Sequence, residues 1–336
     1  MGDDEIIIRT RSLTKIYGSR TIALNGVDLS VRRGSVFGFL GPNGAGKTTT
    51  LRLILGLQQP SAGSVEVFGT RSGPNTSGIR ARIGYLPTNP EFPPDMTPIT
   101  YLDFVGKLCG MNREARTPRL AGLIRAVGLL HAQARRVGTF STGMRTRLGI
   151  AASLMHDPEL IVWDEPCSGL DPAGRRHTMD LIRWMAGAKT VVVSSHILTD
   201  IDQVCTHVGV LSEGRLIFCG EVAEMKRQIR IDAITVELLA SEDSLASFVG
   251  QAKACAWVGD VAREGGRFIL PVTDGAAIAT ALSDVLAMTR KAEAELISVT
   301  TGLGRVEDAY LQMLEDDGAQ GFMRACGGNG LSGGEA

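Results

Sequence analysis

The sequence predicts an α/β fold built around a largely parallel sheet, followed by a smaller α+β domain. Strand-like apolar runs alternate with helix-like stretches, which is the pattern of parallel strands joined by crossover helices. A glycine-rich loop joins the strand 35–40 to a helix pattern at 49–54. Strand-like segments at 6–9, 21–31 and 65–67 predict a β-rich opening before this core.

The glycine-rich loop has the composition of a phosphate-binding site. Its glycines let the backbone curl so that successive N–H groups point at a phosphate, and the following helix adds the partial positive charge of its N-terminus. In such a loop Lys47 bridges the β- and γ-phosphates and the Thr48 hydroxyl holds Mg²⁺. An accidental turn is the alternative, because the chain has 41 glycines. The predicted nucleotide contacts are Gly41, Pro42, Asn43, Gly44, Ala45, Gly46, Lys47, Thr48 and Thr49.

Two carboxylates end the apolar strand at 160–163. A Mg²⁺ ion requires an acidic ligand such as Asp164, and an attacking water requires a base such as Glu165. A chance acidic strand end is the alternative, and the phosphate loop upstream argues against it. The later strand 191–195 leads to His196, where a lone histidine is usually structural. Because His196 follows the phosphate loop and the two carboxylates along the chain, we expect it to contact the γ-phosphate.

A turn of hydroxyl and glycine residues lies between the loop and the carboxylates. Ser141 and Gly143 precede a helix pattern, so this turn predicts a second anion-binding helix N-terminus. The run 168–171 follows the carboxylates and ends at Asp171. This ordered set resembles the ATP-binding domain of ABC (ATP-binding cassette) transporters over about residues 6–225. Ser141 and Gly143 match the signature turn of that family, and Asp171 matches its D-loop.

The resemblance implies a P-loop ABC ATPase core with a helical subdomain, which binds ATP and Mg²⁺. It implies that Lys47, Glu165 and His196 are catalytic. It places Tyr17 against adenine, with strand packing as the alternative role of that ring. In the family two such domains form a head-to-tail dimer, in which the signature turn of one chain completes the site around ATP bound by the other.

The sequence departs from the family pattern in three places. The signature turn has Thr142 and Met144 where glycine and glutamine are usual, as in some drug-export and ABC-2 type subunits. Thr88 occupies the position of the Q-loop glutamine. Because its hydroxyl side chain is shorter than glutamine, we expect Thr88 to reach Mg²⁺ and the attacking water through a bridging water, and the amide of Asn89 is the alternative. The run 331–335 spells a signature-like sequence, but no helix pattern follows it. We interpret it as part of a flexible glycine-rich tail.

The predicted ATP-binding domain, 1–225, is followed by a segment without phosphate chemistry. The expected order βαββαβ indicates a small ferredoxin-like domain at 230–315, for which we expect a regulatory, dimer-stabilising or partner-binding role. A closing helix at 306–314 and a flexible tail at 316–336 complete the chain. The expected elements of the small domain are a strand at 233–238, a helix at 244–253, a hairpin across 264–266, a helix at 276–290 and a strand at 296–300.

Composition restricts the functional classes. The formal net charge is −1 and no basic stretch carries interleaved aromatic residues, which argues against nucleic acid as a partner. The apolar runs are shorter than the ~18 residues that span a bilayer, and the acidic start lacks the pattern of a signal peptide, so we expect the chain in the cytosol. The six cysteines form no Cys-x-x-Cys pair, which indicates reduced thiols and no zinc site.

These observations predict the ATP-hydrolysing subunit of an ABC transporter, an exporter of the drug or ABC-2 type. We expect a homodimer, peripheral to the cytoplasmic side of the cell membrane, that acts on separate integral-membrane permease subunits. The short amphipathic helix expected at 100–108 either closes the core of the helical subdomain or helps to receive a coupling helix of the permease. The alternative function is a soluble ABC ATPase acting on ribosomes or DNA. The single cassette and the lack of a long coiled coil argue against it.

Overall fold

The computed structural model describes residues 6–18, 21–228, 233–272 and 278–302, with Tyr310, Met313, Leu314 and Asp317 beyond them. The chain divides into two compact units between Val222 and Ala223. Apart from those four isolated positions, the predicted closing helix at 306–314 and the predicted tail at 316–336 lie outside the described residues.

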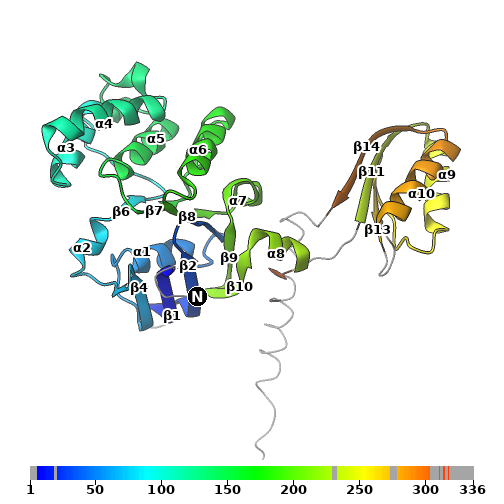
Figure 1. Ribbon diagram of the computed structural model, residues 1–336, viewed down its shortest axis with the longest axis horizontal. Coiled ribbons are helices and arrows are strands. Elements are labelled where there is room, and N and C mark those ends of the chain that lie inside the picture. The colour runs from blue at the N-terminus through cyan, green and yellow to red at the C-terminus, as the bar shows by residue number, and fades with distance from the viewer. Residues whose placement is uncertain are drawn as a thin grey trace, which may run out of the picture. The chain divides into compact units, whose positions relative to one another are not determined.

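An antiparallel sheet opens the first unit, as the strand-like start of the sequence predicts. Its two long strands pair through several register shifts, and one of them alternates buried and exposed positions, which is typical of a sheet with one face on the core. The strand order is β2-β1-β4-β5 (Figure 1). The strands are β1 (Ile6–Tyr17), β2 (Thr21–Arg32), β4 (Ala62–Val67) and β5 (Thr70–Arg71).

A six-stranded mixed sheet forms the centre of this unit, with the order β10-β9-β3-β8-β7-β6. All neighbours in it are parallel except the edge strand β10, which confirms the predicted parallel core. Strands β3, β7 and β8 are buried at every position, as expected for strands covered on both faces. The strands are β3 (Val36–Leu40), β6 (Ile83–Leu86), β7 (Leu160–Asp164), β8 (Thr190–Ser195), β9 (His207–Ser212) and β10 (Arg215–Glu221).

The two sheets share one hydrophobic core with helix α1 (Lys47–Ile54). Phe37 and Phe39 of β3, Leu51 of α1 and Val162 of β7 belong to it, together with apolar side chains of β1, β2 and β4. Full burial of a side chain of this size stabilises the fold by about 1.5–3 kcal/mol. Because α1 is anchored in this core, the side chains of its first turn have fixed positions at the end of β3.

Three helices form a helical subdomain and contact one another (Figure 1). The predicted helix at 100–108 is confirmed, and it starts two residues earlier because Thr97 caps it and Pro98 fits its first turn. Its residue Leu102 is buried, whereas Phe104 and Leu108 are exposed. The helices are α3 (Pro98–Leu108), α4 (Arg113–Ala126) and α5 (Thr142–Ser153), and the 3₁₀ turns Leu130–Ala132 and Val137–Thr139 precede α5.

Two further helices follow the carboxyl ends of β7 and β8 and pack against β8 and against each other. They are α6 (Pro172–Met185) and α7 (Leu198–Val204). The remaining helices are α2 (Ser77–Arg80), near β6, and α8 (Val222–Gln228), at the boundary between the units.

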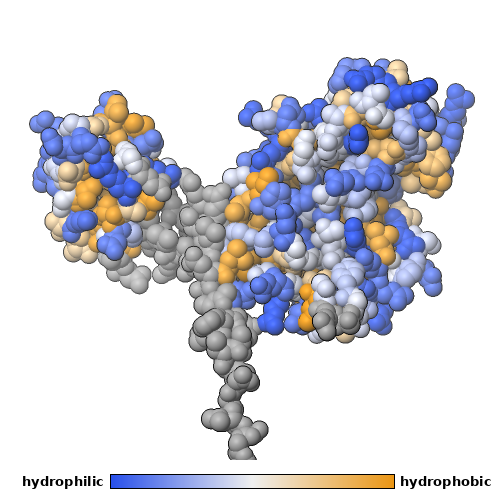
Figure 2. All heavy atoms as spheres, turned by 180° about the vertical axis from the view of Figure 1, so that it is seen from behind, coloured by the Kyte–Doolittle hydropathy of each residue, from blue (hydrophilic) through white to orange (hydrophobic). Residues whose placement is uncertain are grey.

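The surface is mixed in polarity. The face in Figure 2 carries hydrophobic residues in small patches among hydrophilic ones. Exposed apolar side chains of the first unit include Phe104 and Leu108 on α3 and Trp184 on α6. In the part of the chain that the structure describes, no helix is both long enough and apolar enough to cross a membrane.

The second unit is an antiparallel sheet with two helices, in the predicted order βαββαβ. The strand order β12-β13-β11-β14, and a core that includes Phe248 and Phe268, match a ferredoxin-like arrangement. The predicted α+β fold is therefore confirmed, with element ends that differ by at most two residues. The elements are β11 (Ala233–Leu239), α9 (Glu242–Lys253), β12 (Ala262–Glu264), β13 (Arg267–Pro271), α10 (Ile278–Lys291) and β14 (Glu295–Gly302).

Candidate active site

The phosphate loop lies at the carboxyl end of β3, where the sequence predicts it. Its backbone is left-handed at Gly44 and Gly46, with φ of 87° and 107°, a conformation that residues with side chains rarely adopt. Gly41 and Ala45 of the same loop are buried and are not among the residues that line the cavity it borders. This cavity has a volume of about 240 Å³. It is lined by Ala23, Pro42, Asn43, Gly44, Gly46, Lys47, Thr48, Thr49, Thr88 and Glu165.

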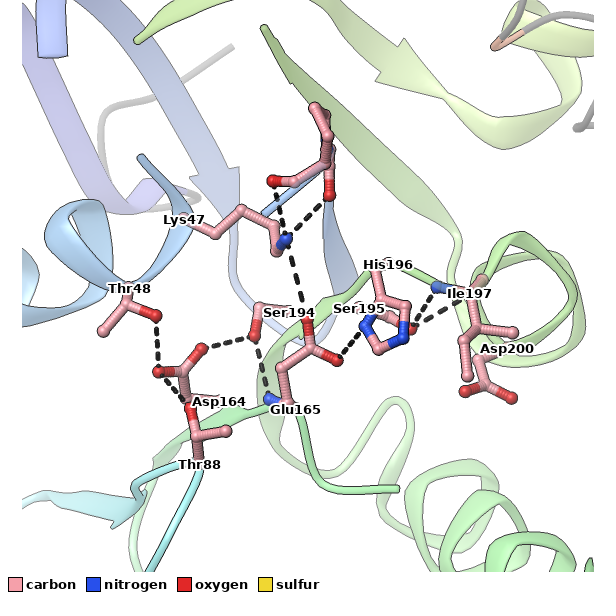
Figure 3. A network of polar contacts seen from close by, with 12 residues as sticks. Lys47, Thr48, Thr88, Asp164, Glu165, Ser194, Ser195, His196, Ile197 and Asp200 are labelled. Carbon is pink, nitrogen blue, oxygen red and sulfur yellow. Dashed lines mark hydrogen bonds and ion pairs between the residues drawn. The ribbon is translucent and has the colours of Figure 1, made fainter. Parts of the chain in front are cut away.

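Lys47 is the cation of this cavity wall, and only 6% of its side chain is exposed. Its ammonium group donates to the carbonyl oxygens of Gly41 at 2.6 Å and Pro42 at 3.2 Å, and it lies 3.6 Å from Oε1 of Glu165 (Figure 3). These acceptors satisfy a charge that would otherwise be costly to bury. Phosphate oxygens are stronger acceptors than carbonyl oxygens, so the ammonium group is placed to exchange its partners for them.

Three hydroxyl groups converge on Asp164 at the end of β7 (Figure 3). Thr48 and Thr88 donate to its Oδ2 at 2.8 and 2.9 Å, and Ser194 donates to its Oδ1 at 2.6 Å. Asp164 is 1% exposed, and a buried carboxylate requires such donors because burial disfavours its charge. The structure therefore brings the predicted Thr48, Thr88 and Asp164 together. Asn89 is exposed and does not line the cavity.

Ser194 is a site residue that the motifs did not identify. Its Oγ donates to Asp164 and accepts from the backbone N–H of Glu165 at 2.9 Å. Glu165 has a φ of +53°, a strained conformation that persists only where surrounding contacts hold it. Asp164 and Ser194 are directly paired in the parallel register of β7 and β8. An alignment of the two strand sequences in that register is the signal that could have revealed Ser194.

Glu165 and His196 pair at the side of the cavity. Nδ1 of His196 lies 2.8 Å from Oε2 of Glu165, whose other carboxylate oxygen faces Lys47 (Figure 3). The Glu165 side chain is largely buried, whereas about half of the imidazole is exposed. A carboxylate held in this way beside a cavity can accept a proton from water, and the histidine keeps its second nitrogen free for another contact.

The signature turn and the D-loop lie outside this cavity. Ser141 caps α5 by accepting from the N–H of Met144 at 3.3 Å, and Asp171 caps α6 by accepting from the N–H of Gly174 at 3.2 Å. Both capping residues are exposed. Neither of them, nor Gly143, is among the residues that line the cavity. Within one chain, these predicted residues do not meet the phosphate loop.

Tyr17 ends β1 and is also absent from the cavity lining. Its hydroxyl donates to Oε1 of Gln58 at 2.5 Å, and Nζ of Lys15 lies 5.2 Å from its ring centre. The tyrosine is partly exposed. The structure thus gives Tyr17 a hydrogen bond within the fold, and its contact with adenine stays a prediction.

The fold and these contacts define a P-loop nucleoside triphosphatase. A family model described as ABC transporter matches residues 24–168. A bacitracin transport ATP-binding protein of Bacillus licheniformis is 41% identical over 213 residues, which are 63% of this chain and 68% of that protein. A linearmycin resistance ATP-binding protein of Bacillus subtilis is 33% identical over 76% of this chain and 81% of that protein. Nod factor export ATP-binding protein I of Ralstonia nicotianae is 36% identical over 68% of this chain and 72% of that protein.

Solved structures have the same fold in the first unit. The ATP-binding subunit of an ABC transporter matches with a TM-score of 0.62 and 26% identity, over 66% of this chain and 92% of that one. A dimeric ATP-binding cassette bound to ADP and phosphate matches with a TM-score of 0.60, over 64% of this chain and 99% of that one. Because the two sequences are only 23% identical, this likeness shows the fold alone. The chain belongs to the ABC transporter family, as its ATP-binding and ATP-hydrolysing subunit.

Proposed function

We propose that this chain hydrolyses ATP to power export through separate membrane permease subunits, at the cytoplasmic side of the membrane. The observation that carries the proposal is the convergence of three hydroxyl groups on Asp164, beside the contact of Lys47 with Glu165. Export is supported by the relatives, among which are a bacitracin transport protein and a Nod factor export protein. The permease, not this chain, would select the cargo.

Mg²⁺ fits the cluster at Asp164. This ion takes oxygen ligands, and Asp164 with the hydroxyls of Thr48 and Thr88 supplies three of them beside a cavity bordered by the phosphate loop. We therefore assign these three residues to Mg²⁺. When bound, the ion supplies positive charge against the phosphate oxygens of ATP.

The remaining side chains have roles that follow from their positions. Lys47 exchanges the carbonyl oxygens of its loop for the β- and γ-phosphate oxygens of ATP. Glu165 accepts the proton of the attacking water, because its carboxylate lines the cavity and is held by His196. His196 orients Glu165 through Nδ1 and contacts the γ-phosphate through its other nitrogen. Tyr17 supports the adenine ring.

A second copy of the chain completes the site. Ser141, Gly143 and Asp171 lie outside the cavity of their own chain, so they contact nucleotide only when another chain supplies it. Helix α5 begins after Ser141, and the partial positive charge of its N-terminus favours an anion there. We therefore place two ATP molecules between two chains that associate head to tail.

The substitution Glu165→Gln tests the assignment of the base. The amide is nearly isosteric but cannot accept the proton, so turnover should fall by roughly 10²–10⁴ while the affinity for ATP is retained. The matched control is Glu159→Gln, because Glu159 pairs with Arg82 away from the cavity and its loss should leave turnover unchanged. Near wild-type turnover in Glu165→Gln would refute the proposed mechanism.

A further inference from the structure

A second polar cluster adjoins the catalytic pair, and Glu165 lines both its pocket and the phosphate cavity. A small pocket is lined there by Glu165, Cys167, His196 and Asp200, among other residues of β8, α6 and α7. Asp200 stands on α7, close to His196 (Figure 3), and only 5% of its side chain is exposed. Burial, reinforced by the charge of Asp200, raises the pKa of Cys167 to about 12, so the thiol in this pocket stays neutral.

The carboxylate of Asp200 is only half satisfied. Its Oδ1 accepts from Nε of Arg175 at 2.6 Å, whereas its buried Oδ2 has no partner with normal hydrogen-bond geometry, and the Ser195 hydroxyl lies near the carboxylate. Leaving a buried polar atom without a well-placed partner destabilises the fold. Burial raises the pKa of Asp200 against the opposing effects of Arg175, His196 and Ser195. The packing of α7 does not require a charge, because Ile201 and Val204 supply its buried apolar side chains. A buried carboxylate that the packing of its helix does not require, placed beside a catalytic pair, points to a functional role.

Arg175 connects α6 to α7 by two contacts. Its Nε binds Asp200, and its Nη2 donates to the hydroxyl of Thr199 at 3.1 Å. Helix α6 itself begins after Asp171, whose carboxylate lies 3.1 Å from Nη2 of Arg147 on α5. A continuous run of polar contacts therefore joins the helix after the signature turn, the helix after the D-loop and the helix after the histidine.

Helix α7 has few local stabilising contacts of its own. It has seven residues, and its N-cap residue, Ile197, offers no side-chain cap. So short a helix is not stable by itself, and its position must come from tertiary contacts. The hydroxyl of Ser195 accepts from the N–H of Ile197 at 2.9 Å. The two contacts of Arg175 hold the first turn of α7 against α6, and Nη2 of Arg183 on α6 donates to Oε1 of Gln203 on α7 at 3.1 Å. The place of His196, two residues before α7, therefore depends on α6.

We propose that Asp200 is a positioning residue for His196, and that through Arg175 it links the D-loop helix to the catalytic pair of the same chain. The proposal rests on the dimeric ATPase proposed above. In the dimer, the second copy contacts Asp171 and the signature turn and so fixes the position of α6. The Arg175–Asp200 ion pair then makes α7 adopt a matching position. Asp200 does not touch ATP, so its loss changes the rate of hydrolysis rather than the affinity for the nucleotide.

The test compares Asp200→Asn and Arg175→Gln in the full chain. We expect each variant to lower kcat by roughly 3- to 30-fold, with little change in KM for ATP or in Tm. If Asp200→Asn does not fold, Arg175→Gln carries the test, because a third of the Arg175 side chain is exposed. The matched control is Asp95→Asn, which removes an exposed ion pair with Arg136 that involves neither α6 nor α7, and it should leave kcat unchanged.

A double-mutant cycle with His196→Ala separates positioning from a general structural role. Because Asp200 acts through the imidazole, Asp200→Asn should add no further loss in the His196→Ala background, measured as single-turnover rates. Equal fold losses in both backgrounds would overturn the proposal, as would unchanged kcat in both Asp200→Asn and Arg175→Gln. The proposed function is judged separately, by wild-type turnover and its loss in Glu165→Gln.

Discussion

In the first unit, strands β3, β6, β7 and β8 run parallel, and the loops after all four contribute side chains to one site. In the second unit the neighbouring strands are antiparallel, and its polar contacts serve its own fold. Arg263 on β12 pairs with Glu242 of α9, and Nε1 of Trp257 donates to Asp284 of α10.

The difference follows from strand direction. Parallel strands end at the same edge of a sheet, so loops that are far apart in the sequence meet there. Antiparallel strands end alternately at opposite edges, and their loops separate. The catalytic motifs of this chain thus gather because they follow parallel strands, and each prediction below tests whether chemistry is confined to that edge.

Among the variants that compare the two units, the largest effect is expected for Lys47→Ala. Without the ammonium group the cavity loses its lysine contact to the phosphates, so ATP turnover should fall by roughly 10²–10³. Isothermal titration calorimetry should also show weaker ATP binding. The control in the second unit is Arg263→Ala, whose ion pair with Glu242 lies outside the site, and it should hydrolyse ATP at the wild-type rate. Equal losses in both variants would contradict the division between the units.

A smaller effect is expected for Ser194→Ala. Removal of the hydroxyl leaves Asp164 Oδ1 and the N–H of Glu165 without their shared partner, so kcat should fall by roughly 10-fold, corresponding to about 1.4 kcal/mol. Ser194→Thr keeps the hydroxyl and should restore most of the activity.

The control for Ser194 is Ser153→Ala, which also removes a buried hydroxyl but one that bonds Trp163 away from the cavity. This variant should lower Tm without lowering kcat of the folded protein. A kcat for Ser194→Ala that matches the wild type would show that Ser194 supports only the fold.

Sequence motifs predicted the local parts of the site and missed the contacts between strands and helices. The phosphate loop could be predicted because its glycines, lysine and helix start are consecutive. Ser194 and Arg175 could not, because each acts on a side chain 30 or 25 positions away that tertiary folding brings close. The second unit was predictable as a fold, since its alternating strands and periodic helices are local patterns, but local patterns do not indicate a function for it.

A modest effect is expected for Thr88→Gln. Thr88 reaches Asp164 with a short hydroxyl side chain, whereas a glutamine amide extends further into the cavity and can contact the attacking water directly. Basal hydrolysis should rise by about 2- to 5-fold, because the variant no longer needs a bridging water, whose immobilisation costs about 0–2 kcal/mol. Asn89→Ala is the control and should change the rate little, because Asn89 is exposed outside the cavity. A large loss in Asn89→Ala with no gain in Thr88→Gln would transfer the role to Asn89.

The smallest effect on catalysis is expected for Phe248→Ala. Phe248 is fully buried in the core of the second unit, so its truncation should destabilise that unit by about 3–5 kcal/mol. Thermal unfolding should show an earlier transition, whereas ATP turnover below that transition should match the wild type. Loss of turnover in step with unfolding of the second unit would show that the catalytic edge depends on it.

The central claim is that two chains share each ATP site, and the mass of Glu165→Gln in solution tests it most directly. Slow hydrolysis should trap the ATP-bound state, so light scattering with Mg²⁺ and ATP should give twice the 35.7 kDa of one chain, and the mass of one chain without nucleotide. A single-chain mass in both conditions, while the wild type hydrolyses ATP, would contradict the head-to-tail site.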